Sequence, residues 1–201
     1  IATSLSAAFQ GFKKHGWTPL VDLSWHIKTN NLFSFLFPLN TKKLESVFPE
    51  KKLSNLGKLN DCIYQSDFTE FTDWRKSFYK TKKYYLSYKE GEHSIQFGVK
   101  INIRKKIIRE LIIGEVNTNH YDSHFIQNGI QFLLKKVKGI NSITFVSIAI
   151  NPENEKISRA INNSNFKPIK NKIHIIIKPL IKNDELLNNK VWNLYRADLD
   201  S

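Results

Sequence analysis

Methionine is absent from the 201 residues of this chain, and cysteine occurs once, as Cys62. One cysteine excludes an internal disulfide and any zinc site that needs several cysteines. No apolar run approaches the roughly 20 residues that a membrane-spanning helix requires, and no segment has the basic end, apolar stretch and cleavage site of a secretory signal. These absences predict a cytoplasmic protein without a membrane partner.

The beginning of the chain indicates part of a longer protein. It opens with Ile1, whereas a complete reading frame opens with methionine. Apolar residues recur at helical spacing from Leu5 to Phe12, so we predict an amphipathic helix over Ala2–His15 that is already under way at the first residue. Because a domain seldom begins with a buried helix and no lead-in, we expect catalytic parts to lie before residue 1.

The chain is strongly basic, with a formal net charge of +13, yet only 5 of its 31 basic residues are arginine. The charge is spread evenly, with 15 basic against 9 acidic residues in the first hundred positions and 16 against 9 in the remainder. Arginine is the side chain that pairs in bidentate fashion with phosphate and guanine. Its scarcity disfavours specific nucleic-acid recognition but leaves nucleic acid open as a partner.

The densest basic cluster lies in the middle of the chain. Its members are Lys100, Arg104, Lys105, Lys106 and Arg109. We interpret it as a solvated hairpin turn between two strands. The alternative is a surface that binds phosphate or another polyanion.

Composition and periodicity divide the chain into two units. Residues 1–40 hold the first helix, Gly16 as its left-handed cap, and a strand over Trp17–Lys28. Residues 41–72 are rich in lysine and lack clear periodicity beyond a short helical stretch, so we predict a linker there. Residues 73–201 form the second unit.

The second unit alternates between strand and helix patterns. Apolar patterns predict strands over Tyr84–Lys89, Ser94–Ile103, Ile107–Val116, Ile143–Ile150 and Lys172–Leu180. A helix is predicted from Asp122 or Ser123 to Lys138, with Gly139 as its stop, and another from Asn151 to Asn163. The order of three strands, helix, strand, helix, strand indicates an α+β or mixed α/β fold.

Two helix-to-strand passages resemble each other at a constant offset of 149 residues. The first contains Ala8, Phe12, Gly16 and Trp17, and the second contains Ile157, Ile161, Asn165 and Phe166. Each has apolar residues four apart on a helix, then a Gly or Asn suited to a left-handed cap, then a bulky aromatic residue. We interpret the passages as matching parts of two related domains.

This passage resembles the final helix of the GNAT acyltransferase fold. Two further stretches, Phe71-Thr72-Asp73-Trp74-Arg75 before Tyr84-Tyr85 and the closing Val191–Asp200, resemble bacterial double-GNAT proteins, which often occur among surface-polysaccharide biosynthesis functions. The resemblance implies a GNAT-like, mostly antiparallel central sheet flanked by helices. Residues 1–40 would be the tail of a first such domain, and residues 73–201 a second.

The resemblance also implies acetyl-CoA or another acyl-CoA as cofactor. In GNAT domains two strands splay apart, the pantetheine arm pairs with one of them, and the pyrophosphate lies at the N-terminus of the next helix. Here the matching loop, Asn117–His124, contains no glycine and places Asp122 where the phosphates would lie. The usual proton-donating Tyr is replaced by Phe12 and Ile161 in the two passages. We therefore expect the second domain to be degenerate.

Candidate site residues follow from this correspondence. Cofactor contacts would come from Asn117, Asn119, His120 and Asn154, and substrate contacts from Trp74, Arg75 and Glu115. No residue is assigned as catalytic. Glu110 and Glu115 could serve as a base on the central strand, and the alternative is solvated or salt-bridged carboxylates. For Trp74 and Arg75 the alternative is packing at the entry to the second domain.

Metal binding is not expected. His120 and His124 flank Asp122, but one of these histidines falls in a loop and the sequence offers no third ligand.

The function we expect is transfer of an acyl group from acyl-CoA to an amine, with an amino sugar or glycan precursor as the candidate acceptor. The second domain would be mainly structural or acceptor-binding. One alternative is a non-catalytic basic module for an anionic partner such as RNA, whose binding would weaken steeply with salt. Another is a Fem-like aminoacyl transferase, which also uses paired GNAT domains.

Overall fold

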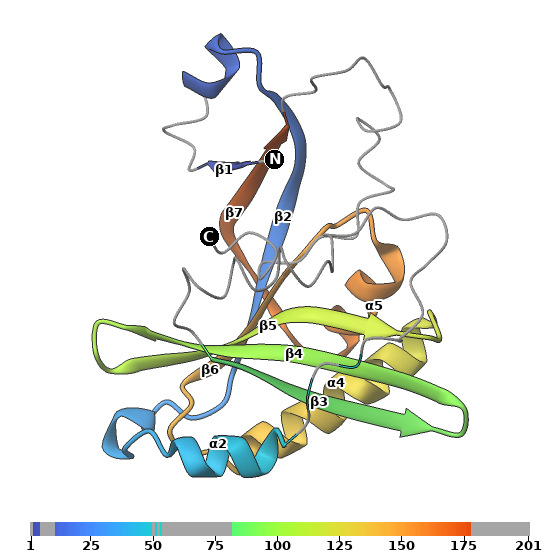
Figure 1. Ribbon diagram of the computed structural model, residues 1–201. Coiled ribbons are helices and arrows are strands. Elements are labelled where there is room, and N and C mark those ends of the chain that lie inside the picture. The colour runs from blue at the N-terminus through green and yellow to red at the C-terminus, as the bar shows by residue number, and fades with distance from the viewer. Residues whose placement is uncertain (1, 5–10, 50, 52, 54–81, 178–201) are drawn as a thin grey trace.

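The computed structural model describes residues 2–4, 11–49, 51, 53 and 82–177 (Figure 1). Within this part of the chain seven strands form one open sheet in the order β1-β7-β2-β6-β5-β4-β3. The strands are β1 (Ala2–Ser4), β2 (Thr18–Thr29), β3 (Lys83–Glu90), β4 (His93–Arg104), β5 (Ile108–Thr118), β6 (Phe145–Ile150) and β7 (Lys167–Ile177). The helices are η1 (Ser34–Leu36), α2 (Thr41–Val47), α4 (Ser123–Lys138) and α5 (Glu155–Asn163). The predicted α+β class, with a mostly antiparallel sheet, is confirmed.

Strands β3, β4 and β5 form an antiparallel meander, as their alternating apolar residues predict. The β3–β4 turn contains Gly91 in the left-handed region, at φ 59°. The β4–β5 turn places Lys105 and Lys106 at φ 49° and 63°, where a non-glycine residue costs roughly 1 kcal/mol. The densest basic cluster therefore spans a hairpin turn, as we interpreted it.

Strands β5 and β6 are the one parallel pair among the described strands, in register from Glu110↔Phe145 to Ile113↔Ile148. A parallel pair needs a crossover, and α4 supplies it. The apolar stripe of α4 is buried against the sheet. At Gly129 an added Cβ would lie 2.7 Å from Cγ2 of Ile95, so glycine permits this close approach of helix to sheet.

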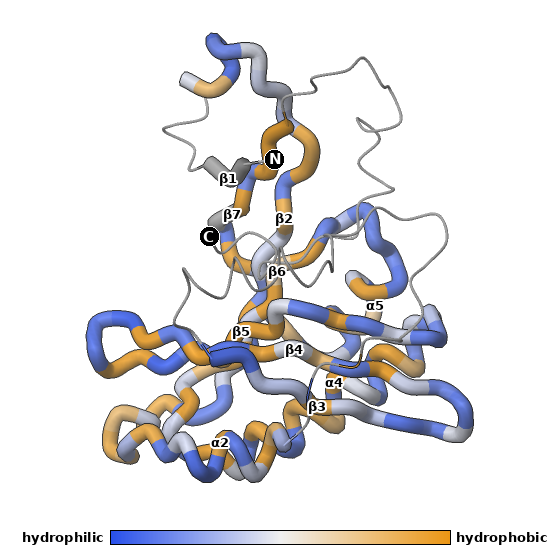
Figure 2. The backbone as a smooth tube through the Cα atoms, in the orientation of Figure 1, coloured by the Kyte–Doolittle hydropathy of each residue, from blue (hydrophilic) through white to orange (hydrophobic). Residues whose placement is uncertain are grey.

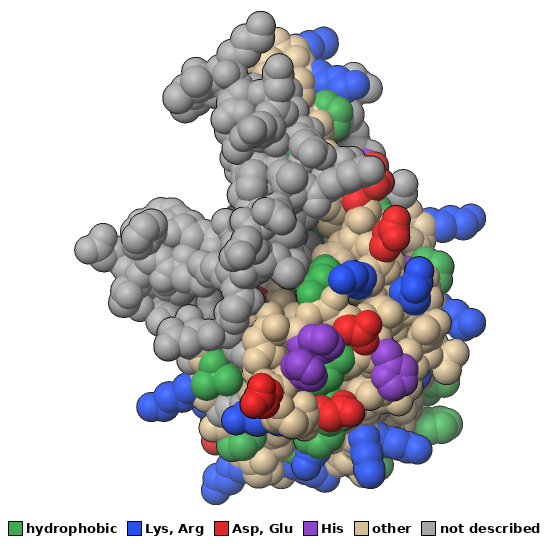
Figure 3. Space-filling view, turned by 90° about the vertical axis from the view of Figure 1, so that its right-hand side faces the viewer, with side chains coloured by type: hydrophobic (Ala, Val, Ile, Leu, Met, Phe, Trp, Pro, Cys, Tyr) green, Lys and Arg blue, Asp and Glu red, His purple; other side chains and the backbone are tan. Residues whose placement is uncertain are grey.

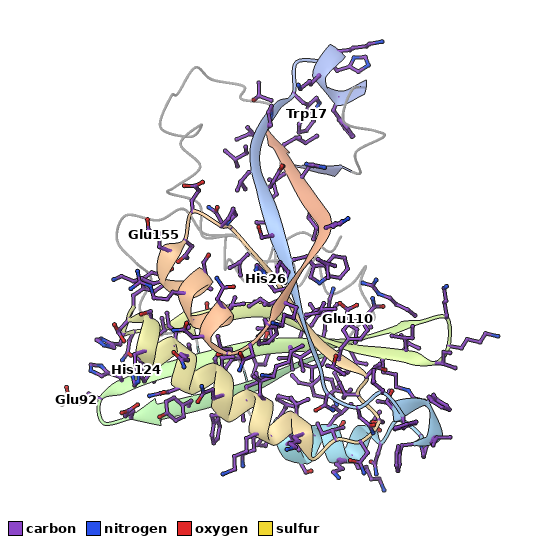
Figure 4. All side chains as sticks on the ribbon, turned by 180° about the vertical axis from the view of Figure 1, so that it is seen from behind. Trp17, His26, Glu92, Glu110, His124 and Glu155 are labelled. Carbon is purple, nitrogen blue, oxygen red and sulfur yellow. The ribbon has the colours of Figure 1, made fainter. Side chains whose placement is uncertain are left out.

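Helices α4 and α5 both cover one face of the sheet (Figure 4). The main core lies between them and the strands, and α2 adds Leu44 to it while Phe48 follows at its end. A second, smaller apolar cluster lies between β2, β6 and β7 and includes Leu23, Ala149 and Ile175. Figure 2 shows apolar stretches on these elements and also on the segment before α2.

The predicted first helix is wrong at its start. Ala2–Ser4 forms β1, which pairs antiparallel with β7 through Thr3↔Ile175, while residues 11–14 are helical and residues 5–10 lie outside the described residues. The apolar helical period begins only at Leu5, so backbone pairing with an apolar strand decides the conformation of the residues before it.

The helix predicted over Asn151–Asn163 is also wrong at its start, because α5 begins at Glu155 rather than at Asn151. The Asn154 side chain accepts a hydrogen bond from the backbone N–H of Ile157, which marks Asn154 as the N-cap. Strand β7 begins at Lys167, five residues before its predicted start, and residues 178–180 lie outside the described residues. Gly139 ends α4 as predicted, but at φ −71° in the right-handed region.

The segments that the sequence suggested as separate units share one sheet where the structure describes them. β2 lies between β6 and β7 and pairs with both. In the segment expected to be a linker, Leu44 and Phe48 are buried in the main core, and residues 54–72 lie outside the described residues. The division at 1–40, 41–72 and 73–201 stays a prediction.

Candidate functional site

The site develops where the parallel pair ends. β5 and β6 are hydrogen-bonded only as far as Ile113 and Ile148, whereas the strands continue to Thr118 and Ile150. The β4–β5 register shifts at the same level, because Gly98 pairs with Glu115 and Val99 with Ile113, so Gly114 is an extra residue. A bulge of this kind bends its strand. The two strands thus part toward the N-termini of α4 and α5.

The N-terminus of α4 is closed by its own sequence. Oδ1 of Asp122 accepts hydrogen bonds from the backbone N–H groups of His124 (2.9 Å) and Phe125 (3.0 Å). The N–H of Phe125 above all, with that of His124, holds the pKa of the Asp122 carboxyl below its usual range. The first donors of the helix are therefore used, and a carboxylate lies where an incoming phosphate would need them.

The end of β5 and the loop that follows it hold three of the expected cofactor residues, Asn117 on the strand and Asn119 and His120 in the loop. Asn119 is committed to the β3–β4 turn, because its Oδ1 accepts from Ser94 N (2.7 Å) and its Nδ2 donates to Glu92 O (3.0 Å). Asn117 lies opposite Gln96 in the β4–β5 ladder. Asn119 thus ties the loop to β4 and its turn, while Asn117 belongs to the sheet.

His120 is held by an aromatic stack. The centroid of its ring lies 3.8 Å from that of His93 at an interplanar angle of 14°, and both rings make T-shaped contacts with Phe125. Figure 3 shows histidine and acidic side chains gathered on this end of the molecule. His124 lies at the same end but outside this stack, on the first turn of α4, where its Nδ1 is 3.5 Å from Nδ2 of Asn128. Among the described residues no group of three or more His, Cys, Asp or Glu side chains could hold a metal ion.

Asn154, the fourth expected cofactor residue, lies on the neighbouring loop as the cap of α5. The two loops are connected by Lys156, whose Nζ donates to the carbonyl of Tyr121 (2.8 Å) and lies 5.4 Å from the Tyr121 ring centroid. The structure thus brings Asn154 near the α4 loop, with its side chain used as a cap. Lys156 is a residue that sequence reasoning missed, since nothing in its local pattern distinguishes it from other helix lysines.

Of the expected substrate residues, Trp74 and Arg75 lie outside the described residues. Glu115 is on β5 at the bulge, with a side chain 13% exposed, and its Oε1 accepts from Nζ of Lys83 at 2.6 Å. The salt-bridged interpretation of this carboxylate is confirmed. The pair lies on the sheet face opposite α4. Glu115 lies across from Gly98, Gly98 lies across from Tyr85, and Lys83 is two residues from Tyr85 on the same face of β3. The other face carries Ile95 and Phe97, which meet Gly129 of α4.

That face carries a second buried polar group, Gln96, which sequence reasoning did not single out. Its Nε2 donates to Lys51 O (3.1 Å) and Ser87 Oγ (3.2 Å), and its Oε1 accepts from Leu53 N (2.9 Å). No sequence signal distinguishes it, because alternation with Ile95 and Phe97 predicts an ordinary solvent-facing residue at this position. The face opposite α4 is thus polar around Glu115.

Glu110, the other candidate base, lies at the far end of the parallel pair, away from the end marked by Glu92 and His124 (Figure 4). It is fully buried and accepts hydrogen bonds from Ser147 Oγ and from Arg104 Nη2 (2.8 Å). The Arg104 guanidinium also lies 4.9 Å from the Trp25 ring centroid. These contacts balance a buried charge and assign Glu110 to the support of the sheet.

Part of the basic cluster makes hydrogen bonds and ion pairs within the protein. Nη1 of Arg109 donates to the carbonyls of Ser34 (2.9 Å) and Phe37 (2.7 Å), while Arg104 pairs with Glu110. Both arginines of the cluster are therefore committed to contacts within the protein.

No protein-family model, curated protein or solved structure matches this chain. No helix among the residues that the structure describes is long and apolar enough to cross a membrane. The fold and the site define an α+β protein with a mostly antiparallel open sheet in which one parallel pair diverges between two helix N-termini.

Proposed function

We propose that this chain is part of an acyl-CoA-dependent N-acyltransferase of the GNAT type, in which the described unit supports the fold and binds the amine acceptor. The observation that carries the proposal is the parting of β5 and β6 beyond Ile113 and Ile148, in a sheet that is otherwise antiparallel. A divergence of two parallel strands beside a crossover helix is the feature that the resemblance implies for this family. The bulge at Gly114 adds to this support.

We assign the acceptor, and not acyl-CoA, to this unit because of the N-terminus of α4, the helix that would face the cofactor. Asp122 uses the first N–H donors of α4 and keeps a negative charge there, which opposes a pyrophosphate. The side chains of Asn119 and Asn154 are likewise engaged within the protein. Acyl-CoA would therefore bind to another part of the complete protein.

The acceptor function is supported by the Glu115–Lys83 pair. The carboxylate is largely buried and already holds an ammonium group, whereas the lysine side chain is 42% exposed and therefore free to swing toward water. An acceptor amine in its protonated form could replace Lys83 on the carboxylate. In the complete protein, the Glu115 carboxylate could also act as the general base that takes a proton from the acceptor amine.

Two titrations test the proposal. Calorimetry with acetyl-CoA at low and at moderate salt should show no saturable binding to this chain. Saturable binding that survives moderate salt would overturn this assignment and make this unit an acyl-CoA site.

The second titration uses glucosamine, with N-acetylglucosamine as the matched sugar that lacks a free amine, followed by saturation-transfer NMR. Glucosamine should bind the native chain. It should bind the Lys83→Gln variant more tightly than the native chain and the Glu115→Gln variant more weakly. The control is Glu92→Gln, at an exposed carboxylate, which should bind glucosamine as the native chain does. Absence of binding to both the native chain and Lys83→Gln would reject the acceptor role.

The alternative of an RNA-binding module has less support. Arg104 and Arg109, the residues best suited to phosphate, are engaged within the protein. A Fem-like aminoacyl transferase would share the paired-domain architecture, and no described contact favours its substrate over a simple amine.

A further inference from the structure

The segment between β2 and α2 exposes an unusual density of large apolar side chains. Within six residues the exposed fractions are 69% for Leu32, 65% for Phe33, 54% for Phe35, 66% for Leu36 and 40% for Phe37. Single exposed apolar residues are ordinary, but a contiguous group of this size marks an interaction surface. We call residues 32–37 the aromatic turn.

The aromatic turn is held rigidly from beneath. Ser34, at its centre, is buried, and its Oγ lies 2.6 Å from Oγ1 of Thr144. The backbone carbonyls of Ser34 and Phe37 both accept from Nη1 of Arg109. These contacts fix the backbone with its apolar side chains outward, so the turn cannot bury them by folding back.

A second set of contacts anchors the entry to the turn. Nδ2 of Asn30 donates to the carbonyls of Ile140 (3.3 Å) and Ile143 (3.0 Å), and Nδ2 of Asn31 donates to that of Asn141 (2.7 Å). The aromatic turn is therefore attached to the loop before β6 at several points. Its order comes from polar anchors rather than from burial of its own side chains.

The segment that contains the aromatic turn and the neighbouring β4–β5 hairpin are rich in basic residues. Residues 28–44 contain three lysines and no acidic residue, and residues 100–109, at the β4–β5 hairpin, contain five basic residues and no acidic residue. Arg109 connects the two segments, and the ribbon shows the hairpin tip and the segment before α2 at the same end of the molecule (Figure 1). Ile103 and Ile107, 51% and 56% exposed, add apolar area at the hairpin.

We propose that this end of the molecule binds the surface of an anionic lipid bilayer, with the aromatic turn entering the headgroup region and Lys105 and Lys106 contacting lipid phosphates. Outward Phe and Leu flanked by lysines are the combination that an interfacial contact requires. This proposal departs from the prediction of no membrane partner made from the sequence, which rested on the lack of a membrane-spanning segment. The proposal is independent of the proposed acyltransfer.

A bilayer fits better than a second copy of this chain. Two copies joined through the aromatic turn would bring the lysines of both hairpins together, and residues 28–44 and 100–109 of each copy contain no acidic residue to offset them. The fixed, outward-facing side chains also suit a soft surface into which they can insert. A protein partner would need an acidic and apolar groove of matching shape.

The test is co-sedimentation with vesicles of phosphatidylcholine and phosphatidylglycerol, compared with pure phosphatidylcholine. We expect binding to the anionic vesicles, a loss of about tenfold or more in affinity for Phe33→Ser/Phe35→Ser, and a smaller loss for Lys105→Gln/Lys106→Gln. Leu53→Ser, at an exposed leucine outside the aromatic turn, and Lys89→Gln, on β3, are the matched controls and should bind as the native chain does. Circular dichroism and thermal melting establish that each variant is folded.

Three results would overturn the proposal. One is no binding of the native chain to anionic vesicles. Another is binding that salt abolishes but Phe33→Ser/Phe35→Ser leaves unchanged, which would show adhesion by net charge alone. The third is a dimer in light scattering that the same double substitution dissociates, because the aromatic turn would then serve as an interface between copies.

Discussion

Gly16 and Asn165, 149 residues apart, end their helices in the same left-handed conformation, at φ 78° and 60°. In each case the residue after the cap donates its N–H to a carbonyl five residues earlier, Trp17 to Phe12 (3.2 Å) and Phe166 to Ile161 (3.3 Å). This is the 6→1 hydrogen bond of a Schellman cap. The local similarity predicted from sequence is confirmed at the level of backbone geometry.

The strands that follow these caps are neighbours. β2 and β7 pair antiparallel, β6 pairs with β2, and β1 pairs with β7. Each strand that precedes a helix thus pairs with the strand that follows the other helix. Two related units that exchange their last strands would produce this arrangement, and the relationship between them stays a prediction.

The two caps should respond alike to substitution. Gly16→Ala and Asn165→Ala each place a Cβ-bearing residue without a local hydrogen-bonding side chain at positive φ, so each should lower the free energy of unfolding by about 1 kcal/mol. Asn165→Gly should be neutral or stabilising. Urea unfolding measures this, with Gly11→Ala as a control of opposite sign, because Gly11 is helical and an added Cβ would meet nothing within 4 Å. A destabilising Gly11→Ala would contradict the assignment.

The buried carboxylate of Glu110 depends on Arg104. Arg104→Gln should destabilise the fold by roughly 3 kcal/mol, because it leaves the buried charge without its cation. The double variant Arg104→Gln/Glu110→Gln should recover part of this loss. Lys106→Gln, on the adjacent turn, is the control and should have the same urea unfolding midpoint as the native chain. Additive effects of Arg104→Gln and Glu110→Gln would show that the pair is not coupled.

Stability near neutral pH should depend on His26. Burial lowers the pKa of His26 below 6.5, and its Nδ1 lies 3.2 Å from Ser24 O. Because the unfolded chain takes up this proton at a higher pH than the folded one, the stabilisation is complete above pH 6.5 and is lost as the pH falls from 6.5 toward the folded pKa. Urea unfolding between pH 5 and pH 8 should show that the free energy of unfolding changes less with pH in the His26→Asn variant than in the native chain. Equal changes in the two would contradict the prediction.

Asp122 should contribute at acid pH. Its folded pKa is lowered, chiefly by the Phe125 N–H, so its contribution to stability is present above the unfolded value of 3.8 and is lost as the pH falls through the folded pKa. Asp122→Asn should keep the cap and lose this pH dependence, whereas Asp122→Ala should lower the melting temperature by a few degrees at pH 7. Melting curves at pH 7 and pH 3 measure both effects. A pH dependence retained in Asp122→Asn would reject the assignment.

Much of the local structure could be predicted from the sequence. The alternating Ile95, Phe97 and Val99 predicted β4, and Asp122 before an apolar helical stripe predicted the start of α4. The salt-bridged state of Glu115 was one of two interpretations, and the ladder that places it opposite Gly98 beside Lys83 decided between them. The commitment of Asn119 to the β3–β4 turn was not predictable, because its partners are 25 and 27 residues away.

Sequence patterns alone predicted β2 to β6, part of β7 and helix α4 with its Asp122 cap, because side-chain period and capping hydrogen bonds act within a few residues. Three features depend on contacts between distant parts of the chain: β2 lies between β6 and β7, Ala2–Ser4 is a strand, and Arg109 holds the aromatic turn outward. These contacts join residues separated by tens of positions or more. Their stability comes from backbone pairing and buried polar groups that no local pattern encodes.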